Sequence, residues 1–279
     1  MITYNKKDIP FHLQKYFEPA ELGLEPTFQE YINKLCDIFD EIKRALKKEG
    51  TCWVNLGDTY MNDSSYSKAG RQGYGNDKVG MIYKDDSQCP KKSLCQIPSR
   101  FAIEMTNRGW ILRNEIIWHK PNCMPSSVKD RFTVDFEKIF FFVKNKKYWF
   151  ETQYEPHQAP LGKPRAFAKK GNDDRNDTGR IYNPQKDTST QGRNKRCVWK
   201  ITTKPYKEAH FAVFPEDLVR TPIKAGCPKG GIVLDPFCGS GTTGVVAKKL
   251  GRNFIGIDLN PEYLELAKKR INNTQKSLF

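Results

Sequence analysis

Three glycines near the end of the chain have a spacing that is typical of nucleoside binding. Gly239, Gly241 and Gly244 form a Gly-x-Gly-x-x-Gly pattern between a short apolar run, 231–235, and a run with helical spacing. Glycines allow a tight turn and a close approach of the backbone to a bound group. Asp258 follows the next apolar run, where a carboxylate can accept hydrogen bonds from both ribose hydroxyls. The pattern predicts a nucleoside-cofactor site, and the alternative is an ordinary turn between a strand and a helix.

The position of this unit in the chain favours a particular order of elements. Only 21 residues follow Asp258, and they are typical of a helix and a tail. A conventional dinucleotide-binding unit opens its domain and is followed by further strands. Here the sheet must instead be completed by strands from the first half of the chain. We therefore expect a permuted α/β fold in which the cofactor half comes last.

Apolar periodicity predicts the elements that position these residues. Helical spacing indicates helices over 28–46, 97–109, 214–226, 242–250 and 261–271. Short apolar runs indicate strands over 51–56, 110–118, 138–144, 231–235 and 253–258. Residues 61–97 are rich in polar residues and glycine without a sustained period, which predicts a long loop.

Positive charge is concentrated in one segment of the chain. The 279 residues include 47 Lys and Arg against 32 Asp and Glu, a net charge of +15 that favours polyanionic partners. Residues 144–200 hold 14 basic and six acidic side chains, so +8 of this excess lies there. Aromatic residues lie between the basic ones, which suits contact with phosphates and bases. The segment predicts a nucleic-acid surface; the alternative is a solvated, partly disordered insert.

Composition excludes several classes of protein. Hydrophobic residues make up 38% of the chain, and this fraction is too high for a disordered basic tail. No apolar run approaches the roughly 18 residues of a membrane helix, and the N-terminus lacks the apolar segment of a secretory signal. We therefore expect a cytoplasmic protein without membrane contact. The eight cysteines include no Cys-x-x-Cys pair, which predicts reduced thiols and no metal site.

The sequence around the glycines resembles that of one enzyme family. Residues 235–244, Asp-Pro-Phe-Cys-Gly-Ser-Gly-Thr-Thr-Gly, and 254–263, Phe-Ile-Gly-Ile-Asp-Leu-Asn-Pro-Glu-Tyr, are similar to the S-adenosylmethionine site of DNA amino-methyltransferases. These enzymes modify N4 of cytosine or N6 of adenine. The similarity extends to 53–58, Trp-Val-Asn-Leu-Gly-Asp, and 117–122, Ile-Trp-His-Lys-Pro-Asn. The similarity is to those members of the family in which the catalytic half precedes the cofactor half, an order called the beta arrangement.

The resemblance implies a fold, a cofactor and a substrate. The fold is an α/β, mostly parallel, Rossmann-like methyltransferase sheet with a catalytic half, 1–150, a DNA target-recognition insert, 151–200, and a cofactor half, 201–279. The cofactor is S-adenosylmethionine and the substrate is double-stranded DNA. The resemblance does not decide whether the protein forms a homodimer or whether a cognate restriction endonuclease accompanies it. It also does not decide whether the target base is cytosine or adenine.

The same resemblance implies residues for each role. Those expected to bind the cofactor are Asp235, Pro236, Phe237, Gly239, Gly241, Thr242, Thr243 and Asp258, with Phe214 and Pro215 closing over it from the other side. Those expected to bind DNA are the basic residues of the insert, Lys163, Arg165, Lys169, Lys170, Arg193, Lys195 and Arg196.

One catalytic element of this family has no full counterpart in the chain. Members carry Asp, Asn or Ser followed by Pro-Pro-aromatic; its oxygens accept hydrogens of the target amino group, and its ring stacks on a flipped base. The chain contains no Pro-Pro-aromatic sequence, and Asp8, Pro10 and Phe11 are the nearest match, 15 residues before Gly23. Either the element is degenerate or the N-terminus is shortened. The alternative function is therefore a DNA-binding protein that keeps the fold with impaired catalysis.

Overall fold

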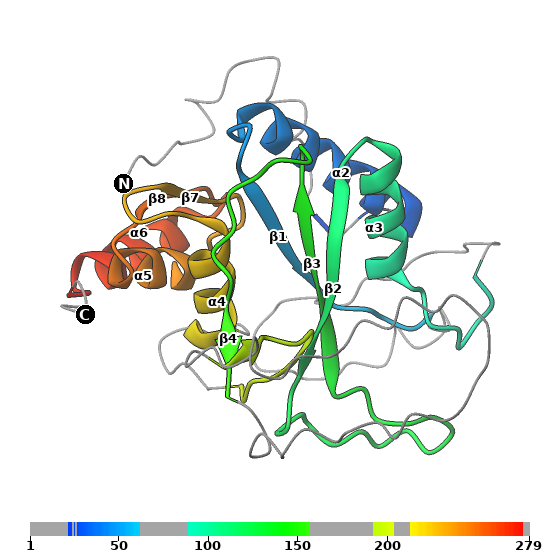
Figure 1. The fold of residues 1–279 in the computed structure, drawn as a ribbon. Helices are drawn as coiled ribbons and strands as arrows, with labels where there is room; N and C mark the ends of the chain where they lie inside the picture. The colour runs from blue at the N-terminus through cyan, green and yellow to red at the C-terminus, as the bar shows by residue number, and fades with distance from the viewer. Residues whose placement is uncertain are drawn as a thin grey trace, which may run out of the picture. The chain divides into compact units, whose positions relative to one another are not determined.

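The chain divides into a large unit, Met1–Glu151 with Cys197–Phe279, and a small unit, Thr152–Arg196. The computed structural model describes the residues 22, 23, 25, 27–61, 89–156, 192–203 and 213–275 (Figure 1). In the small unit, β4 (Tyr154–Glu155) pairs antiparallel with β5 (Arg193–Asn194).

A four-stranded sheet in the order β1-β3-β2-β6 forms the first half of the large unit (Figure 1). Its strands are β1 (Thr51–Leu56), β2 (Ile111–His119), β3 (Phe136–Val143) and β6 (Val198–Lys200). β3 is antiparallel to both of its neighbours, whereas β6 is parallel to β2. β1, β2 and β6 therefore run in the same direction, and their carboxyl ends lie at one edge of the sheet.

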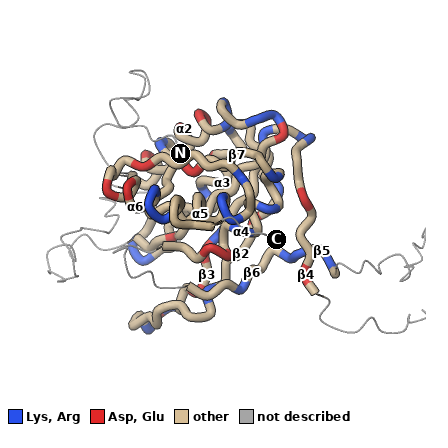
Figure 2. Tube along the Cα trace, turned by 90° about the vertical axis from the view of Figure 1, so that its left-hand side faces the viewer, with Lys and Arg blue, Asp and Glu red and all other residues tan. Residues whose placement is uncertain are grey.

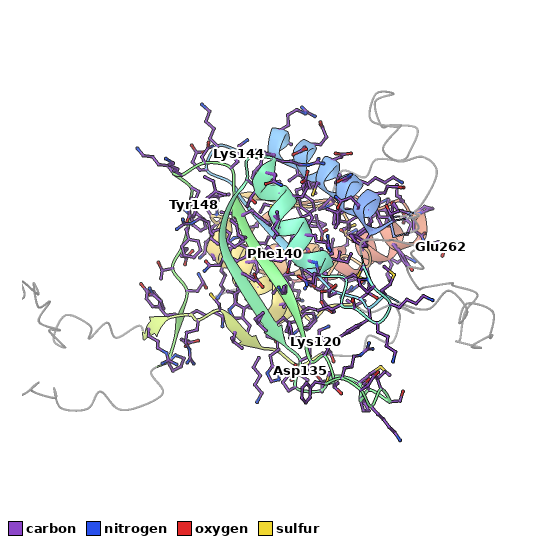
Figure 3. The ribbon with its side chains drawn as sticks, turned by 90° about the vertical axis from the view of Figure 1, so that its right-hand side faces the viewer. Lys120, Asp135, Phe140, Lys144, Tyr148 and Glu262 are labelled. Atoms are coloured by element: carbon purple, nitrogen blue, oxygen red, sulfur yellow. The ribbon has the colours of Figure 1, made fainter. Side chains whose placement is uncertain are left out.

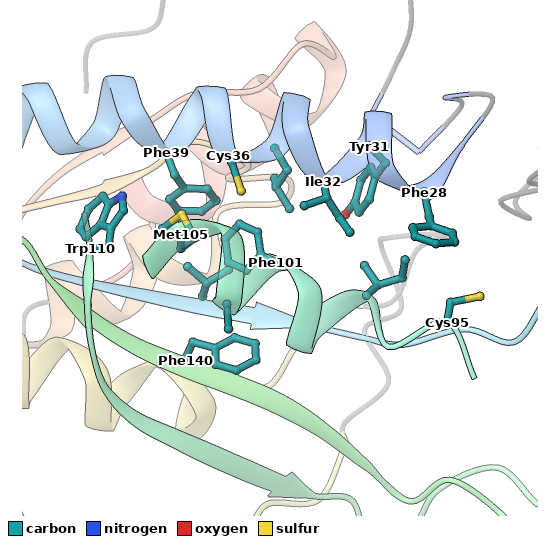
Figure 4. Packing of buried hydrophobic residues seen from close by; sticks show 14 of the residues in the cluster. Phe28, Tyr31, Ile32, Cys36, Phe39, Cys95, Phe101, Met105, Trp110 and Phe140 are labelled. Carbon is teal, nitrogen blue, oxygen red and sulfur yellow. The ribbon is translucent and has the colours of Figure 1, made fainter. Parts of the chain in front are cut away.

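Two helices, α2 (Phe28–Ala45) and α3 (Ile97–Asn107), cover one face of this sheet. The hydroxyl of Thr27 accepts a hydrogen bond from the backbone of Glu30 and so caps α2. Phe101 of α3 is fully buried and packs edge-on against Phe39 of α2 (Figure 4). It also packs edge-on against Phe142 of β3. The helical spacing of apolar residues thus places the core between the helix pair and the sheet.

The cofactor half of the chain forms a second, smaller α/β arrangement in the large unit. β7 (Ile232–Asp235) and β8 (Asn253–Gly256) are parallel, with α5 (Thr242–Lys249) connecting them and α6 (Pro261–Asn272) following. α4 (Glu216–Gly226) precedes β7 and contacts the other face of the first sheet, where Leu218 packs with Trp118 and Trp199. The hydroxyl of Thr51 in β1 also donates to the carbonyl of Gly226, at 3.0 Å.

The structure confirms the α/β class and the helices and strands expected outside the long loop. Within the described residues β7 and β8 pair only with each other, so the expected single sheet completed by strands of the first half is not seen. The parallel pairs are β2–β6 and β7–β8, and the antiparallel direction of β3 is the main feature that the sequence does not predict. An apolar run does not reveal strand direction, and a connection of the length of 120–135 is compatible with either direction. Residues 62–88 of the expected loop lie outside the described residues. No helix in the described part of the chain is long and apolar enough to span a membrane.

Candidate functional site

The turn after β7 is held at both ends by the carboxylate of Asp235. The backbone N–H of Phe237 donates to one oxygen at 3.0 Å, and the hydroxyl of Thr243 donates to the other at 2.5 Å. Burial raises the pKa of Asp235, while these two hydrogen bonds act in the opposite direction and the nearby charge of Asp258 adds to the increase. Asp235 therefore fixes the shape of the turn by bonds within it.

Asp258 lies just after β8 and faces the same turn. One carboxylate oxygen accepts the backbone N–H of Gly239 at 2.8 Å, and the other accepts that of Asn260 at 2.9 Å. Each carboxylate oxygen can accept a further hydrogen bond. Asp258 thus joins the turn after β7 to the start of α6 and keeps acceptor capacity for hydroxyl groups of a ligand.

The glycines of the turn serve two different purposes. Gly239 has φ of +45°, and no atom lies within 4 Å of the position that its Cβ would take, so a ligand has room to approach the backbone there. Gly241 has φ of +80°, and its Cβ would lie 2.7 Å from the Cβ of Ala267 in α6. Gly244 is likewise enclosed by Ile271. The two later glycines are required for helix packing, and only Gly239 fits the expected approach to a ligand.

The packing of Gly241 leads to a stability prediction. Gly241→Ala should lower the free energy of unfolding by about 2 kcal/mol or more, since it adds overlap with Ala267 to the cost of a left-handed backbone. Gly230 is the matched control because it has φ of +76° and no atom within 4 Å of its Cβ position. Gly230→Ala should cost only about 1 kcal/mol in urea-induced unfolding. Equal losses for the two variants would show that the contact with α6 is unimportant.

Arg270 of α6 is a contributor to the site that the sequence analysis missed. Its guanidinium donates to the backbone carbonyl and to the hydroxyl of Ser240, both at 2.7 Å. The arginine thereby supports the glycine turn from the side of α6. No sequence signal indicates this role, because 30 residues separate the partners and basic residues are common near the C-termini of helices.

The remaining cofactor candidates are placed differently. Pro236, Phe237 and Thr242 lie in or directly after the turn. Pro215 is the N-cap of α4, and Phe214 packs with the cluster on the four-stranded sheet. That Phe214 and Pro215 close over a cofactor remains a prediction.

Cys238 lies in the same turn and has no signature of a reactive thiol. Burial, together with the charges of Asp235 and Asp258, raises its pKa to about 12. The thiol therefore stays protonated at neutral pH and acts as a packing group. Among the described residues, no group of three or more His, Cys, Asp or Glu side chains is arranged to hold a metal ion.

The edge of the four-stranded sheet carries a second group of polar residues. Asp58, just after β1, accepts the backbone N–H of Ile97 at 3.0 Å and so anchors the start of α3. Burial raises the pKa of Asp58, although its backbone hydrogen bonds act to lower the pKa. Lys120, just after β2, forms an ion pair with Glu137 and lies 4.3 Å from the centre of the Trp118 ring. These contacts brace the edge at which β1 and β2 end.

The catalytic and DNA-binding candidates are described only in part. Asp8, Pro10, Phe11, Lys163, Arg165, Lys169 and Lys170 lie outside the described residues. In the small unit, Arg193 and Arg196 both form ion pairs with Glu155, at 2.9 and 2.6 Å. Figure 2 marks acidic and basic residues along the chain, with β4 and β5 labelled. Burial alone would raise the pKa of Glu155, but these guanidinium groups hold it below its usual value. Part of the positive charge of the insert is thus balanced locally, which a count of charges does not reveal.

Two parallel strands are joined through a glycine turn and α5, and an aspartate lies at the end of β7 and just after β8. This arrangement is that of an α/β nucleotide-binding unit. The profile of the DNA methylase family of N6- and N4-methyltransferases matches residues 5–269. The chain therefore belongs to this family.

Relatives agree with this assignment, and a solved structure has a similar fold. The chain is 39% identical over 265 residues to the Type II methyltransferase M.SmaI of Serratia marcescens, which covers 93% of this chain and 80% of the relative. It is 37% identical over 266 residues to M.Cfr9I of Citrobacter freundii, with coverage of 93% and 77%. The fold is similar to that of the PvuII DNA methyltransferase (cytosine-N4-specific), with a TM-score of 0.59, 18% identity, and coverage of 92% and 78%.

The chain is an S-adenosylmethionine-dependent DNA methyltransferase that acts on the amino group of cytosine N4 or adenine N6. The expected family, fold class, cofactor and reaction are confirmed. The comparisons give no support to the alternative of a catalytically impaired DNA-binding protein.

Proposed function

We propose that Asp258 binds the ribose of S-adenosylmethionine and that the turn 235–243 holds its methionine part. The observation that carries the proposal is the junction at Gly239, where Asp258 binds the backbone of a turn that has open space beside it. Carboxylate oxygens are suitable acceptors for a ribose diol, and a turn at the start of α5 offers free backbone N–H groups. Asp235, Thr243 and Arg270 support this binding by keeping the turn in one shape.

Methyl transfer needs orientation more than acid or base strength. The bound cofactor supplies an electrophilic methyl group on a sulfonium. The turn 235–243 and Asp258 would hold the cofactor so that this methyl group faces the target amino group. We propose Asp8, Pro10 and Phe11 as the catalytic element: the oxygens of Asp8 and of the backbone accept the amino hydrogens, and Phe11 stacks on the base. A positioned oxygen at the amino group makes the nitrogen lone pair more available for attack.

We also propose that residues 151–200 read the DNA sequence. The net charge of +8 over 144–200 supports this role, because phosphate contacts require Lys and Arg. Glu155 orients Arg193 and Arg196 next to Lys195, while Lys163, Arg165, Lys169 and Lys170 add further positive charge. Binding should therefore weaken steeply as the salt concentration rises.

The biological setting is proposed from the relatives. Their Type II designation associates them with restriction-modification, so we propose that a cognate endonuclease cuts the sequence that this chain protects, in the cytoplasm. A homodimer is proposed as the assembled form. Sedimentation of the full chain with and without DNA tests the dimer, and resistance of the methylated DNA to extracts of the source cells tests the endonuclease.

Expression of the full chain in a host without DNA methyltransferases tests the proposed function. Sequencing that detects modified bases should find one short sequence methylated throughout the host DNA. Asp258→Ala should leave the DNA unmodified, whereas Glu41→Ala, a change at an exposed position of α2, should preserve the modification. Unmodified DNA in cells that contain folded wild-type protein would refute the proposal.

A further inference from the structure

The connection between β2 and β3, residues 120–135, presents large apolar side chains to solvent. Phe132 is 97% exposed and Met124 is 88% exposed, and Val128 and Val134 are also exposed. Single exposed apolar residues are ordinary on protein surfaces. Four of them in one connection, with a phenylalanine ring almost fully in water, indicate a surface that is covered by a partner.

Contacts at its base and along its length hold this connection in place. The backbone N–H of Lys120 donates to the carbonyl of Asp135 at 2.7 Å and closes the base (Figure 3). The side chain of Asn122 exchanges two hydrogen bonds of 3.0 Å with the backbone of Thr203. These bonds keep the connection extended away from the sheet, so Phe132 remains available for a partner.

Two further contacts fix the residues next to Phe132. Asp130 forms an ion pair with Lys92 at 3.0 Å, and the guanidinium of Arg131 lies 3.6 Å from the centre of the Tyr60 ring. Both partners belong to segments beside the end of β1. The aromatic side chain that follows Arg131 is therefore presented from an anchored backbone and does not need to be ordered when a partner binds.

The position of the connection indicates which partner it meets. It leaves the sheet at the edge where β1, β2 and β6 end, and ligands of open α/β sheets bind at the carboxyl ends of strands. The exposed side chains include Lys129 and Arg131 next to the apolar ones. Lys120, Lys129 and Arg131 outnumber Asp130 and Asp135 in this connection. Cations beside an apolar tip match the phosphates and stacked bases of DNA.

We propose that the β2–β3 connection inserts Phe132 into duplex DNA beside the target base. The proposal rests on the proposed function, because a base that is methylated on its amino group must leave the base stack. Extrusion of the base opens a gap in the duplex, and a flat apolar ring fills such a gap without a requirement for sequence. Lys129 contacts an adjacent phosphate, while Arg131 stays against Tyr60 and holds the backbone next to the ring.

Fluorescence of 2-aminopurine tests this insertion directly. The probe is a duplex that carries the sequence found methylated in the host DNA, with 2-aminopurine at the target position. Wild type should raise the fluorescence by unstacking the base. Phe132→Ala should lose most of this increase, bind the duplex about tenfold more weakly, and keep its affinity for S-adenosylmethionine. Ile103→Ala, an exposed apolar truncation on α3, is the matched control, and Phe132→Trp should restore the signal.

The outcomes separate this insertion from the proposed function. If Phe132→Ala methylates, binds and unstacks DNA within twofold of wild type, the insertion is refuted and the proposed function stands. A change only in sedimentation, from dimer to monomer, with DNA binding preserved, also overturns it and assigns the surface to a second copy. Wild-type protein that does not methylate the matching duplex with the natural base at the target position overturns the proposed function and the insertion together.

Discussion

Asp258→Ala weakens the binding of S-adenosylmethionine by about 100-fold or more. The carboxylate provides charged acceptors for the two ribose hydroxyls, and hydrogen bonds to a charged group are each worth about 1.5–3 kcal/mol. The variant also releases the backbone N–H groups of Gly239 and Asn260, which Asp258 binds at 2.8 and 2.9 Å. The turn thus loses both its ligand contact and one of its supports. Isothermal titration calorimetry on the full chain measures the change.

Two further variants separate the loss of charge from a loss of structure. Asp258→Asn retains the size of the side chain and one acceptor, so we expect a weakening of about tenfold. Glu41→Ala removes an exposed carboxylate of α2 and should bind the cofactor as wild type does. An unchanged affinity in Asp258→Ala, with a circular dichroism spectrum like that of wild type, would mean that the ribose is bound elsewhere.

Phe101→Ala lowers the free energy of unfolding by about 3–5 kcal/mol. Phe101 is 0% exposed, and its ring centroid lies 5.4 Å from that of Phe39 and 6.2 Å from that of Phe142. Truncation leaves a cavity between α2, α3 and β3, and the loss of contacts adds to the lost hydrophobic transfer energy. Urea-induced unfolding followed by circular dichroism measures the difference.

A substitution on the other side of the same helix provides the comparison for Phe101. Ile103 of α3 is 61% exposed, and Ile103→Ala should change the free energy of unfolding by less than about 0.5 kcal/mol. Phe101→Leu should fall between the two because leucine fills part of the volume. Unfolding of Phe101→Ala and Ile103→Ala at the same urea concentration would contradict the described core.

Local patterns in the sequence predict the elements of this fold well. The apolar spacing of α2 and the glycine turn between β7 and α5 each lie within a few neighbouring residues, so periodicity and turn chemistry are sufficient. The direction of β3 depends on pairing with strands that are distant in the chain. Such pairing leaves no local signature, and the antiparallel neighbours of β3 became known only from the structure.

The same distinction applies to the candidate site. Asp258 was predicted because it lies at the end of an apolar strand, and Asp235 was predicted from the resemblance to the family. The structure brings both to the turn at Gly239. The support of Ser240 by Arg270 is a contact over a long sequence separation and could not be predicted. For the same reason, the sequence did not reveal that Glu155 pairs with basic residues of the insert. The roles of Asp8, Pro10 and Phe11 remain predictions.

The central claim is that this chain, which contains no Pro-Pro-aromatic sequence, itself transfers a methyl group to DNA. Incubation of the full chain with unmethylated DNA and S-adenosylmethionine carrying a deuterated methyl group, followed by mass spectrometry of the nucleosides, tests it directly. We expect the label in N4-methylcytosine or N6-methyladenine. Absence of labelled nucleosides, with protein that binds the cofactor in calorimetry, would contradict the claim.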